Sequence, residues 1–225
     1  PRRGTAPAAI HRAEDREAFQ DLCRKMDLSF PEGAIARSVE AARREADALG
    51  FPLIVRPSYV LGGPGMAVVT GEEHLDAYLA AAMAVSEDNP LLLDRFLEEA
   101  VEVDADALCD GREALLCGIL EHVEKAGIHS GDSSQVFPPQ TLPARVLQQI
   151  EEATRARPLE LGVIGLLNVQ FALRGDTLYV LEVNPRVSRT VPFLAKARGV
   201  PFPRLAARLV AGRRLSEVAP RLAAP

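Results

Sequence analysis

The residues with the clearest chemical potential lie between Asn168 and Arg189, in the sequence NVQFALRGDTLYVLEVNPRVSR. Gln170, Glu182 and Asn184 carry side-chain oxygens, which are the hard ligands that Mg²⁺ and Mn²⁺ prefer. Proteins that use nucleotides hold such an ion with a few side chains plus the substrate's phosphates. Two interpretations stay open from these residues alone: a divalent-metal site, or a polar strand face that meets solvent.

A β-hairpin is the element that would bring these side chains together. Runs rich in Val, Leu, Phe and Tyr flank the turn-forming residues 174–177, Arg-Gly-Asp-Thr. Side chains alternate between the two faces of a strand, so Glu182 and Asn184 project together. With a loop at residues 175–177, Gln170 lies directly across from Glu182.

Three other stretches could contact a nucleotide, and each has a plainer structural alternative. The loop Gly62-Gly63-Pro64-Gly65 could close over phosphates with its backbone N–H groups, or form a tight turn. The alternating acids Glu102, Asp104 and Asp106 are typical of a solvated strand face, although one of them could bind a ribose. Residues 126–133 suit a phosphate or adenine site better than a catalytic triad, because their Ser, His and Asp are too close in sequence.

The composition is that of an ordinary globular protein, with 48% hydrophobic and 25% charged residues. A net charge of −5 gives no reason to expect nucleic-acid binding. The three cysteines lack metal-ligand spacing, and Cys109 and Cys117 lie in apolar segments that predict core positions, which favours a reducing, cytoplasmic setting. No apolar run is long enough to span a bilayer, so we expect no membrane association. Since the chain begins with Pro1 rather than Met, we expect it to be part of something longer.

Helical and strand periodicities mix without a βαβ rhythm, which predicts an α+β fold in two lobes. Helices are predicted over residues 14–26, 38–49, 72–86, 143–161 and 192–215, and strands over 51–55, 67–70, 91–96, 101–107 and 113–120. We expect residues 121–134 to form a loop and residues 101–107 to form a half-exposed strand. Ser38 is the predicted N-cap of its helix, Gly50 its stop, and Pro158 should break or kink the helix that contains it.

Several segments together resemble the large chain of carbamoyl phosphate synthetases. They are VRPSYVLGG (55–63), LLLDRFLEEAVEVDADALCDG (91–111), EHVEKAGIHSGDS (121–133), GLLNVQFAL (165–173) and LEVNPRVSRTVPFLAKARGVP (181–201). The resemblance runs in order over residues 4–216. The SYVLGG, VEVDADA and TVPF forms look like the C-terminal half of that large chain, which phosphorylates carbamate.

The resemblance implies an ATP-grasp fold, in which two α+β lobes clamp ATP, and it implies roles for particular residues. Gln170, Glu182 and Asn184 would hold Mg²⁺ or Mn²⁺, and Asn184, Arg186 and Arg189 would act on the transferred phosphoryl group. The residues that would line the nucleotide pocket are Arg56, Arg95, Leu97, Glu102, Gly127, Ile128, His129 and Ser130. Glu102 would contact the ribose, and with His122 it would approach a site for a monovalent cation such as K⁺.

The same resemblance implies an ATP-dependent carbon–nitrogen ligase that serves pyrimidine and arginine biosynthesis. Its expected partners are ATP, carbamate, the rest of a large chain and a glutaminase small chain. The expected organisation is an N-terminal helical segment (1–34), a lid lobe with the glycine-rich flap (35–95), a C lobe with the nucleotide and metal site (96–216) and a tail (217–225).

Three positions depart from the family pattern. Pro64 replaces an arginine of the flap, and proline has neither that charge nor a backbone N–H. Ile164 also replaces a usual arginine, and Arg95 replaces histidine or lysine while keeping a donor. Two alternatives to carbamate phosphorylation therefore stay open: a nucleotide-binding module with weakened catalysis, and another ATP-grasp carboxylate–amine ligase.

Overall fold

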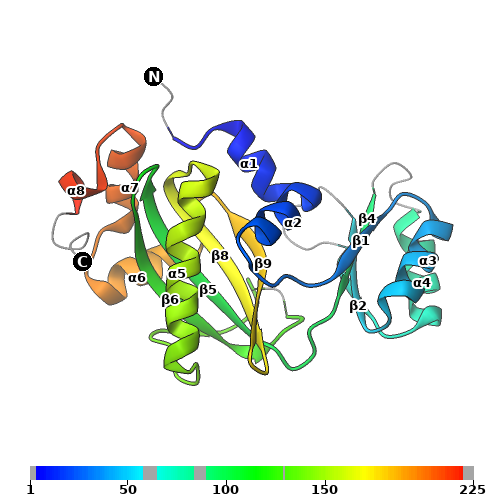
Figure 1. Cartoon of the computed structure of the whole chain (residues 1–225). Helices are drawn as coiled ribbons and strands as arrows, with labels where there is room; N and C mark the ends of the chain where they lie inside the picture. Colours follow the sequence, from blue (N-terminus) through cyan, green and yellow to red (C-terminus); the bar gives the residue numbers. More distant parts are fainter. Residues whose placement is uncertain (1–3, 58–64, 84–89, 129, 220–225) are drawn as a thin grey trace. The chain divides into compact units, whose positions relative to one another are not determined.

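Figure 1 shows the computed structural model of the chain, which describes residues 4–57, 65–83, 90–128 and 130–219. The residues of the predicted flap from 58 to 64, including Pro64, and the predicted nucleotide contact His129 lie outside the described residues. Among the described residues, no helix combines the length and the apolar character needed to cross a bilayer.

The chain divides into two compact units. The larger unit comprises Pro1–Phe30, Glu99–Ala126 and Ser133–Pro225, and the smaller unit comprises Pro31–Glu98 and Gly127–Asp132. Residues 4–30 thus pack with the larger unit. Residues 127–132 join the smaller unit although they follow two strands of the larger one, which no local sequence pattern indicated.

The smaller unit is a four-stranded antiparallel sheet with two helices. Its strand order is β1 (Gly33–Ala36), β4 (Leu91–Arg95), β2 (Leu53–Pro57), β3 (Ala67–Val69), and its helices are α3 (Val39–Leu49) and α4 (Glu72–Met83). The Ser38 side chain accepts a hydrogen bond from the Ala41 N–H and Gly50 follows the last turn, so both predicted ends of α3 are confirmed. Its core consists of the aliphatic side chains of Ala36, Ala42, Ala46, Leu53, Val55, Val69, Leu75, Leu79 and Leu93.

The larger unit is built on a five-stranded antiparallel sheet. Its strand order is β7 (Gln135–Val136), β6 (Ala114–Lys125), β5 (Val101–Asp110), β8 (Ile164–Arg174), β9 (Thr177–Asn184). The helices that the described residues of this unit form are α1 (Pro7–Glu14), α2 (Arg16–Lys25), α5 (Ala144–Leu161), α6 (Thr190–Arg198), α7 (Phe202–Val210) and α8 (Leu215–Val218). The long helix α5 runs along β5, β6 and β8 (Figure 1).

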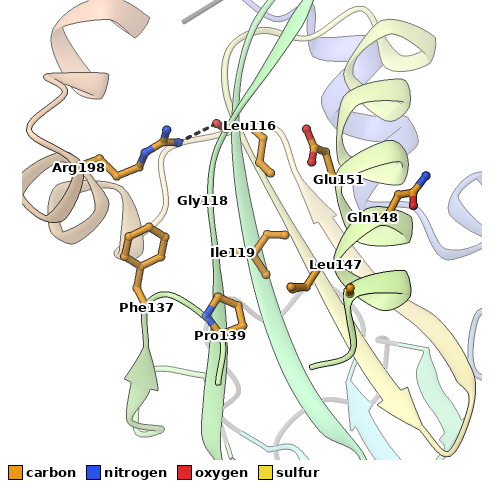
Figure 2. Close-up of a pocket in the computed structure, with 10 residues that line it drawn as sticks. Leu116, Gly118, Ile119, Phe137, Pro139, Leu147, Gln148, Glu151 and Arg198 are labelled. Atoms are coloured by element: carbon orange, nitrogen blue, oxygen red, sulfur yellow. Dashed lines mark hydrogen bonds between the residues drawn. The ribbon is translucent and has the colours of Figure 1, made fainter. Parts of the chain in front are cut away.

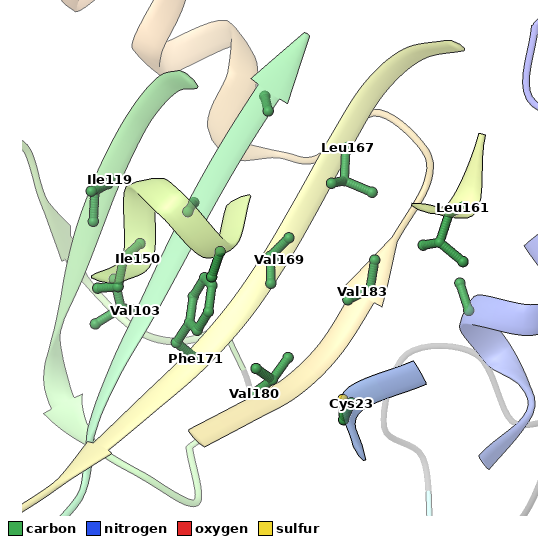
Figure 3. Close-up of a cluster of buried hydrophobic side chains, with 14 of the residues drawn as sticks. Cys23, Val103, Ile119, Ile150, Leu161, Leu167, Val169, Phe171, Val180 and Val183 are labelled. Atoms are coloured by element: carbon green, nitrogen blue, oxygen red, sulfur yellow. The ribbon is translucent and has the colours of Figure 1, made fainter. Parts of the chain in front are cut away.

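One face of this sheet carries the main hydrophobic core. Side chains from β5, β8 and β9 pack there against α2 and α5, and Figure 3 shows Phe171 of β8 in the same cluster as Ile150 of α5 and Cys23 of α2. All three of these side chains are fully buried. Cys109 and Cys117 are buried, as predicted for core positions, and Cys23 is buried as well.

The opposite face has an apolar half and a polar half. Leu108, Leu120 and Leu166 pack under helices α6 to α8, with Phe202 and Leu209 among the helix side chains that cover them. Farther along the same strands the outward positions are occupied by acids and amides. This polar half contains most of the candidate site residues of the larger unit.

Three predictions about individual elements were wrong. Strand β6 continues to Lys125, so residues 121–125 are not loop, because β7 pairs with Glu121 and His122. Helix α5 continues through Pro158 to Leu161 without ending at the proline. Strand β5 is buried from Val103 to Asp110 instead of half exposed.

Candidate functional site

The β8–β9 hairpin forms as predicted, but its loop is shorter than the predicted one at residues 175–177, because Arg174 pairs with Thr177. Gln170 pairs with Glu182, Asn168 pairs with Asn184, and the chain turns between Arg174 and Thr177. Gly175 at the turn has a φ of +58°, a conformation in which glycine avoids the steric cost of a side chain. The prediction that Gln170 lies across from Glu182 is therefore confirmed.

A β-bulge in β9 explains how the hairpin separates its polar and apolar side chains. The register shifts between the pairs Gln170–Glu182 and Phe171–Val180, so Leu181 is an extra residue on β9. Without it, Val180 and Glu182 would share a face, because side chains alternate along a strand. The bulge lets Val180 join Val183 in the core while Glu182 projects with the polar side chains.

Two rows of polar side chains cross the sheet from β5 to β9. Asp104 of β5 pairs with Gln170 of β8, which pairs with Glu182 of β9. The next row consists of Asp106, Asn168 and Asn184. The hairpin residues thus continue a polar surface that begins on a central strand.

Hydrogen bonds connect the three predicted metal ligands to their surroundings. The Gln170 Nε2 donates to Asp104 Oδ1 at 3.2 Å, and the Asn184 Nδ2 donates to Glu182 Oε1 at 2.7 Å. The Arg186 Nη2 donates to Asn184 Oδ1 at 3.1 Å, so one predicted catalytic arginine contacts a predicted ligand.

Asp104 is the centre of a buried polar network. Its Oδ2 lies 2.9 Å from the His122 Nε2 and accepts from the Gln135 Nε2 at 2.7 Å, and its Oδ1 accepts from the Asn168 Nδ2 at 2.9 Å. Burial raises the pKa of Asp104, but hydrogen bonds from its amide and imidazole partners and the charge of His122 outweigh burial and hold the pKa below its usual value. Glu102, the predicted ribose contact, lies 3.8 Å from the His122 Nδ1.

Asp106, in the second row, has no exposed surface and contacts the loop after β9. Its Oδ1 accepts from the Ser188 Oγ at 2.6 Å and from the Asn168 Nδ2 at 3.2 Å, and its Oδ2 accepts from the Thr190 hydroxyl. Burial raises the pKa of Asp106 to about 6, against the opposing effect of the two hydroxyl donors.

The remaining nucleotide-pocket candidates belong to the smaller unit. Arg56 lies on β2 and Arg95 ends β4, where its guanidinium is 3.5 Å from the exposed carboxylate of Glu32. Leu97 is buried, whereas Ile128 is half exposed.

Gly127, another of these candidates, has a φ of +104°. A Cβ at this position would meet the Phe96 ring at 3.0 Å, so the close approach of the two residues favours glycine. The structure thus gathers the predicted site residues into two sets, one in each unit.

Sequence reasoning missed five residues that organise the polar face: Asn168, Gln135, Ser188 and Thr190 were not considered, and Asp104 was interpreted as solvated or ribose-binding. A signal was available for part of this set, because the acids of VDADA alternate opposite the amides of NVQ. The hydroxyls carried no such signal, since they reach Asp106 from more than eighty residues away.

An apolar groove of about 440 Å³ lies elsewhere in the larger unit, at the β6 side of the sheet (Figure 2). Phe137, Leu147 and Ile119 are among its lining residues, and Arg198 crosses its end to donate to the carbonyl oxygens of Leu116 and Cys117. None of the predicted site residues lines it. We assign the chemistry to the polar face of the sheet and not to this groove.

Within the described residues, no group of three or more His, Cys, Asp and Glu side chains could hold a metal ion. A metal on the polar face would therefore need amide oxygens and ligands supplied by a substrate, as predicted for Gln170, Glu182 and Asn184. These assignments stay predictions.

Comparison with known families and proteins gives one consistent result. The family described as carbamoyl-phosphate synthase L chain, ATP binding domain, matches residues 15–218. The carbamoyl phosphate synthase large chain of Thermus thermophilus is 54% identical over 219 residues, which are 97% of this chain and 21% of that protein. The large chain of Pseudomonas aeruginosa is 50% identical over 215 residues, covering 96% of this chain and 20% of that protein. The chain thus spans about a fifth of the length of these relatives.

Solved structures of low sequence identity share the fold. Campylobacter jejuni biotin carboxylase in its β,γ-ATP complex has a TM-score of 0.82 at 17% identity, over 94% of this chain and 49% of that one. The biotin carboxylase domain of Hydrogenobacter thermophilus 2-oxoglutarate carboxylase, in complex with MgADP, ADP and bicarbonate, has a TM-score of 0.79 at 21% identity, over 94% of this chain and 48% of that one. The fold is ATP-grasp, as the resemblance implied.

Proposed function

The chain belongs to the family of carbamoyl-phosphate synthase large-chain ATP-binding domains, and from this premise we propose that it phosphorylates carbamate with ATP. The observation that carries the proposal is the polar face of the β8–β9 hairpin, where Gln170, Glu182 and Asn184 lie next to the loop that bears Arg186 and Arg189. Oxygen ligands beside arginines form a setting that suits a metal-bound phosphate chain.

The residues of the hairpin fit a divalent ion such as Mg²⁺ or Mn²⁺. Gln170 donates its Nε2 to Asp104, which orients its Oε1 away from that carboxylate. Glu182 uses Oε1 to accept from Asn184, and no hydrogen bond to its Oε2 occurs among the described residues. The Glu182 Oε2 and the Gln170 Oε1 thus remain for a hard cation, and the Asn184 Oδ1, which accepts from Arg186, keeps a second lone pair. When bound, the cation would neutralise the phosphate oxygens on which charge accumulates.

The chain's own residues would act by positioning and electrostatics. In the proposed reaction a carbamate oxygen attacks the γ-phosphorus of ATP in line, the bond from phosphorus to the ADP oxygen breaks, and carbamoyl phosphate and ADP form. Arg186 and Arg189 are both exposed on one short loop. Their guanidinium groups would donate to the equatorial oxygens of the transferred group, where fixed donors stabilise the transition state most.

The other nucleotide contacts are proposed from the family resemblance. They are Arg56, Arg95, Leu97, Gly127, Ile128, His129 and Ser130, with Glu102 as the ribose contact. Glu102 and His122, already close to each other, would border a K⁺ site.

The SYVLGG, VEVDADA and TVPF forms support the carbamate-phosphorylating, C-terminal half over the bicarbonate-phosphorylating half. We further propose that the chain works with the rest of a large chain and a glutaminase small chain in the cytoplasm, in pyrimidine and arginine biosynthesis. A lid lobe over residues 35–95 and a C lobe over 96–216 remain the proposed functional organisation.

Pro64 favours a second candidate function, a nucleotide-binding module with weak turnover. A flap arginine donates charge-assisted hydrogen bonds, and the proline at this position can donate none. Under this alternative, the chain binds MgATP, and Pro64→Arg raises its turnover from near zero.

The reverse reaction tests the proposed function. Supplied with carbamoyl phosphate and MgADP, the 225-residue chain should form ATP, measured by a luciferase-coupled assay. Acetyl phosphate in place of carbamoyl phosphate is the matched control and should give a far lower rate. ATP formation from neither donor, together with tight MgATP binding, would contradict the proposal and favour the binding module.

A further inference from the structure

The loop between β9 and α6 carries both proposed catalytic arginines on a short, mostly exposed segment. Pro185 is buried, whereas Arg186, Val187 and Arg189 are exposed. The Arg186 N–H donates to the Asn184 carbonyl oxygen at 2.8 Å, which turns the chain sharply as it leaves the strand. Helix α6 then begins at Thr190. An exposed loop of this kind needs a fixed attachment if its side chains are to be held in one place.

Asp106 supplies that attachment from the centre of the sheet. The two hydroxyls that bond its carboxylate, those of Ser188 and Thr190, are the immediate neighbours of Arg189 on either side. The same two hydroxyls lie 2.6 Å from each other. The carboxyl of Asp106 with these two hydroxyls is called the clasp below. It fixes the backbone on both sides of Arg189.

The clasp is itself held in place. The Asn168 Nδ2 donates to Asp106 Oδ1 at 3.2 Å and to Asp104 Oδ1 at 2.9 Å, so the Asp106 side chain is oriented by the neighbouring strand. Asp106 is completely buried. Burying a carboxyl costs free energy that an aliphatic side chain at the same position would not incur. The stability of the fold alone therefore does not explain why the residue at position 106 is an acid.

We propose that Asp106, acting through Ser188 and Thr190, is a positioning residue that holds Arg189, and with it Arg186, in the geometry for phosphoryl transfer. This inference rests on the proposed function for the arginines, although the clasp itself is a property of the structure. A mobile loop would lose conformational entropy when its arginines bind the transition state. Fixing the backbone beside the guanidinium in advance removes this loss from the activation free energy.

Proteolysis measures the clasp without any assay of activity. Trypsin cleaves after arginine, so release of the loop should expose the bonds after Arg186 and Arg189. Cleavage at Arg174, in the exposed hairpin turn, serves as the internal standard. Relative to that standard, Thr190→Val and Asp106→Asn should each increase cleavage at Arg189 by about tenfold, because each removes a hydrogen bond between a hydroxyl and a carboxylate.

Turnover then separates positioning from general stability. In the reverse reaction Thr190→Val should lower kcat by about tenfold to a hundredfold and leave the KM for MgADP within about twofold of wild type. Thr190→Ser, which keeps the hydroxyl, should restore both kcat and protection from trypsin. The matched control is Thr141→Val, which removes a threonine hydroxyl that donates to the buried carboxylate of Glu121, away from the arginine loop. Thr141→Val should change neither kcat nor trypsin cleavage at Arg189.

Two results would overturn the inference: equal trypsin cleavage at Arg189 in wild type, Thr190→Val and Asp106→Asn, or an unchanged kcat in a variant whose loop has become cleavable. If the wild-type chain forms no ATP at all, the proposed function fails. The proteolysis result alone then decides whether the clasp holds the loop.

Discussion

At the scale of single residues, the protonation of Asp106 is the most informative feature. Three oxygen–oxygen contacts join Asp106, Ser188 and Thr190 in a ring. Two hydroxyl protons can fill only two of these contacts, whereas a third proton on the carboxyl gives every contact one hydrogen bond. Burial and this ring both favour a raised pKa of Asp106, about 6, so the carboxyl takes up the third proton below that pH and accepts from both hydroxyls above it.

Asp106→Asn should change how stability depends on pH. The folded-state pKa of Asp106, about 6, lies above its ordinary value of 3.8, so the folded state binds this proton more tightly than the unfolded state does. The stabilisation is fully present below about pH 4 and is lost as pH rises through about 6, a change of about 3 kcal/mol. The free energy of urea unfolding, measured from pH 4 to 7, should therefore fall less with pH in Asp106→Asn than in wild type.

The difference between the two proteins isolates Asp106 from the other carboxyls. The depressed pKa values of Asp104 and Glu121 act in the opposite direction, since their stabilising contribution is lost as pH falls. Glu121 contributes equally in both proteins and cancels in the comparison, whereas Asp104, whose charge raises the pKa of Asp106, contributes through that coupling. If the free energy of unfolding depended on pH equally in Asp106→Asn and wild type, the pKa of Asp106 would be the same in the folded and unfolded states, which would contradict the prediction.

At the scale of elements, the β8–β9 hairpin was predictable and its surroundings were only partly so. The turn residues and the alternation of side chains on each strand predict the hairpin, but the pairing of Gln170 with Glu182 also needs the bulge at Leu181, because Arg174 pairs with Thr177 at the turn. The bulge at Leu181 was not predicted, because it follows from the need to bury both Val180 and Val183. The extension of β6 was missed for a similar reason: residues 121–125 form strand because Glu121 and Lys125 pair with β5 while Glu121 and His122 pair with β7.

The β6 edge also depends on a contact that is remote in sequence. Strand β7 pairs with β6 only at Glu121 and His122, and the Arg198 guanidinium donates to the Cys117 carbonyl oxygen at 2.9 Å farther along β6. Arginine at this position covers part of a strand edge that could otherwise pair with another chain.

Arg198→Ala should therefore lower stability by about 1 kcal/mol, through loss of the charge-assisted hydrogen bonds to Cys117 and Leu116, and should increase self-association. Urea unfolding and light scattering at increasing protein concentration measure the two effects. Arg204→Ala, which removes an exposed arginine of α7, is the matched control and should behave as wild type. Equal stability and equal light scattering of Arg198→Ala and Arg204→Ala would show that Arg198 does not protect the strand edge.

At the scale of the whole molecule, the ATP-grasp fold was predicted through the family resemblance. Periodicity alone reached only an α+β chain in two lobes. The return of residues 127–132 to the smaller unit was outside the reach of local patterns, because it depends on the packing of Gly127 against Phe96. The chain covers 21% of the Thermus thermophilus relative, so its activity within a longer enzyme stays a proposal.

The most direct test of the central claim, that the β8–β9 hairpin holds the metal that accompanies the nucleotide, is the Mg²⁺ dependence of ATP binding. Isothermal titration calorimetry of wild type and Glu182→Gln, with and without Mg²⁺, measures it. Glu152→Gln, an exposed substitution on α5, is the matched control. We predict that Mg²⁺ strengthens ATP binding at least about tenfold in wild type and in Glu152→Gln, and has little effect in Glu182→Gln. An unchanged Mg²⁺ dependence in Glu182→Gln would contradict the claim.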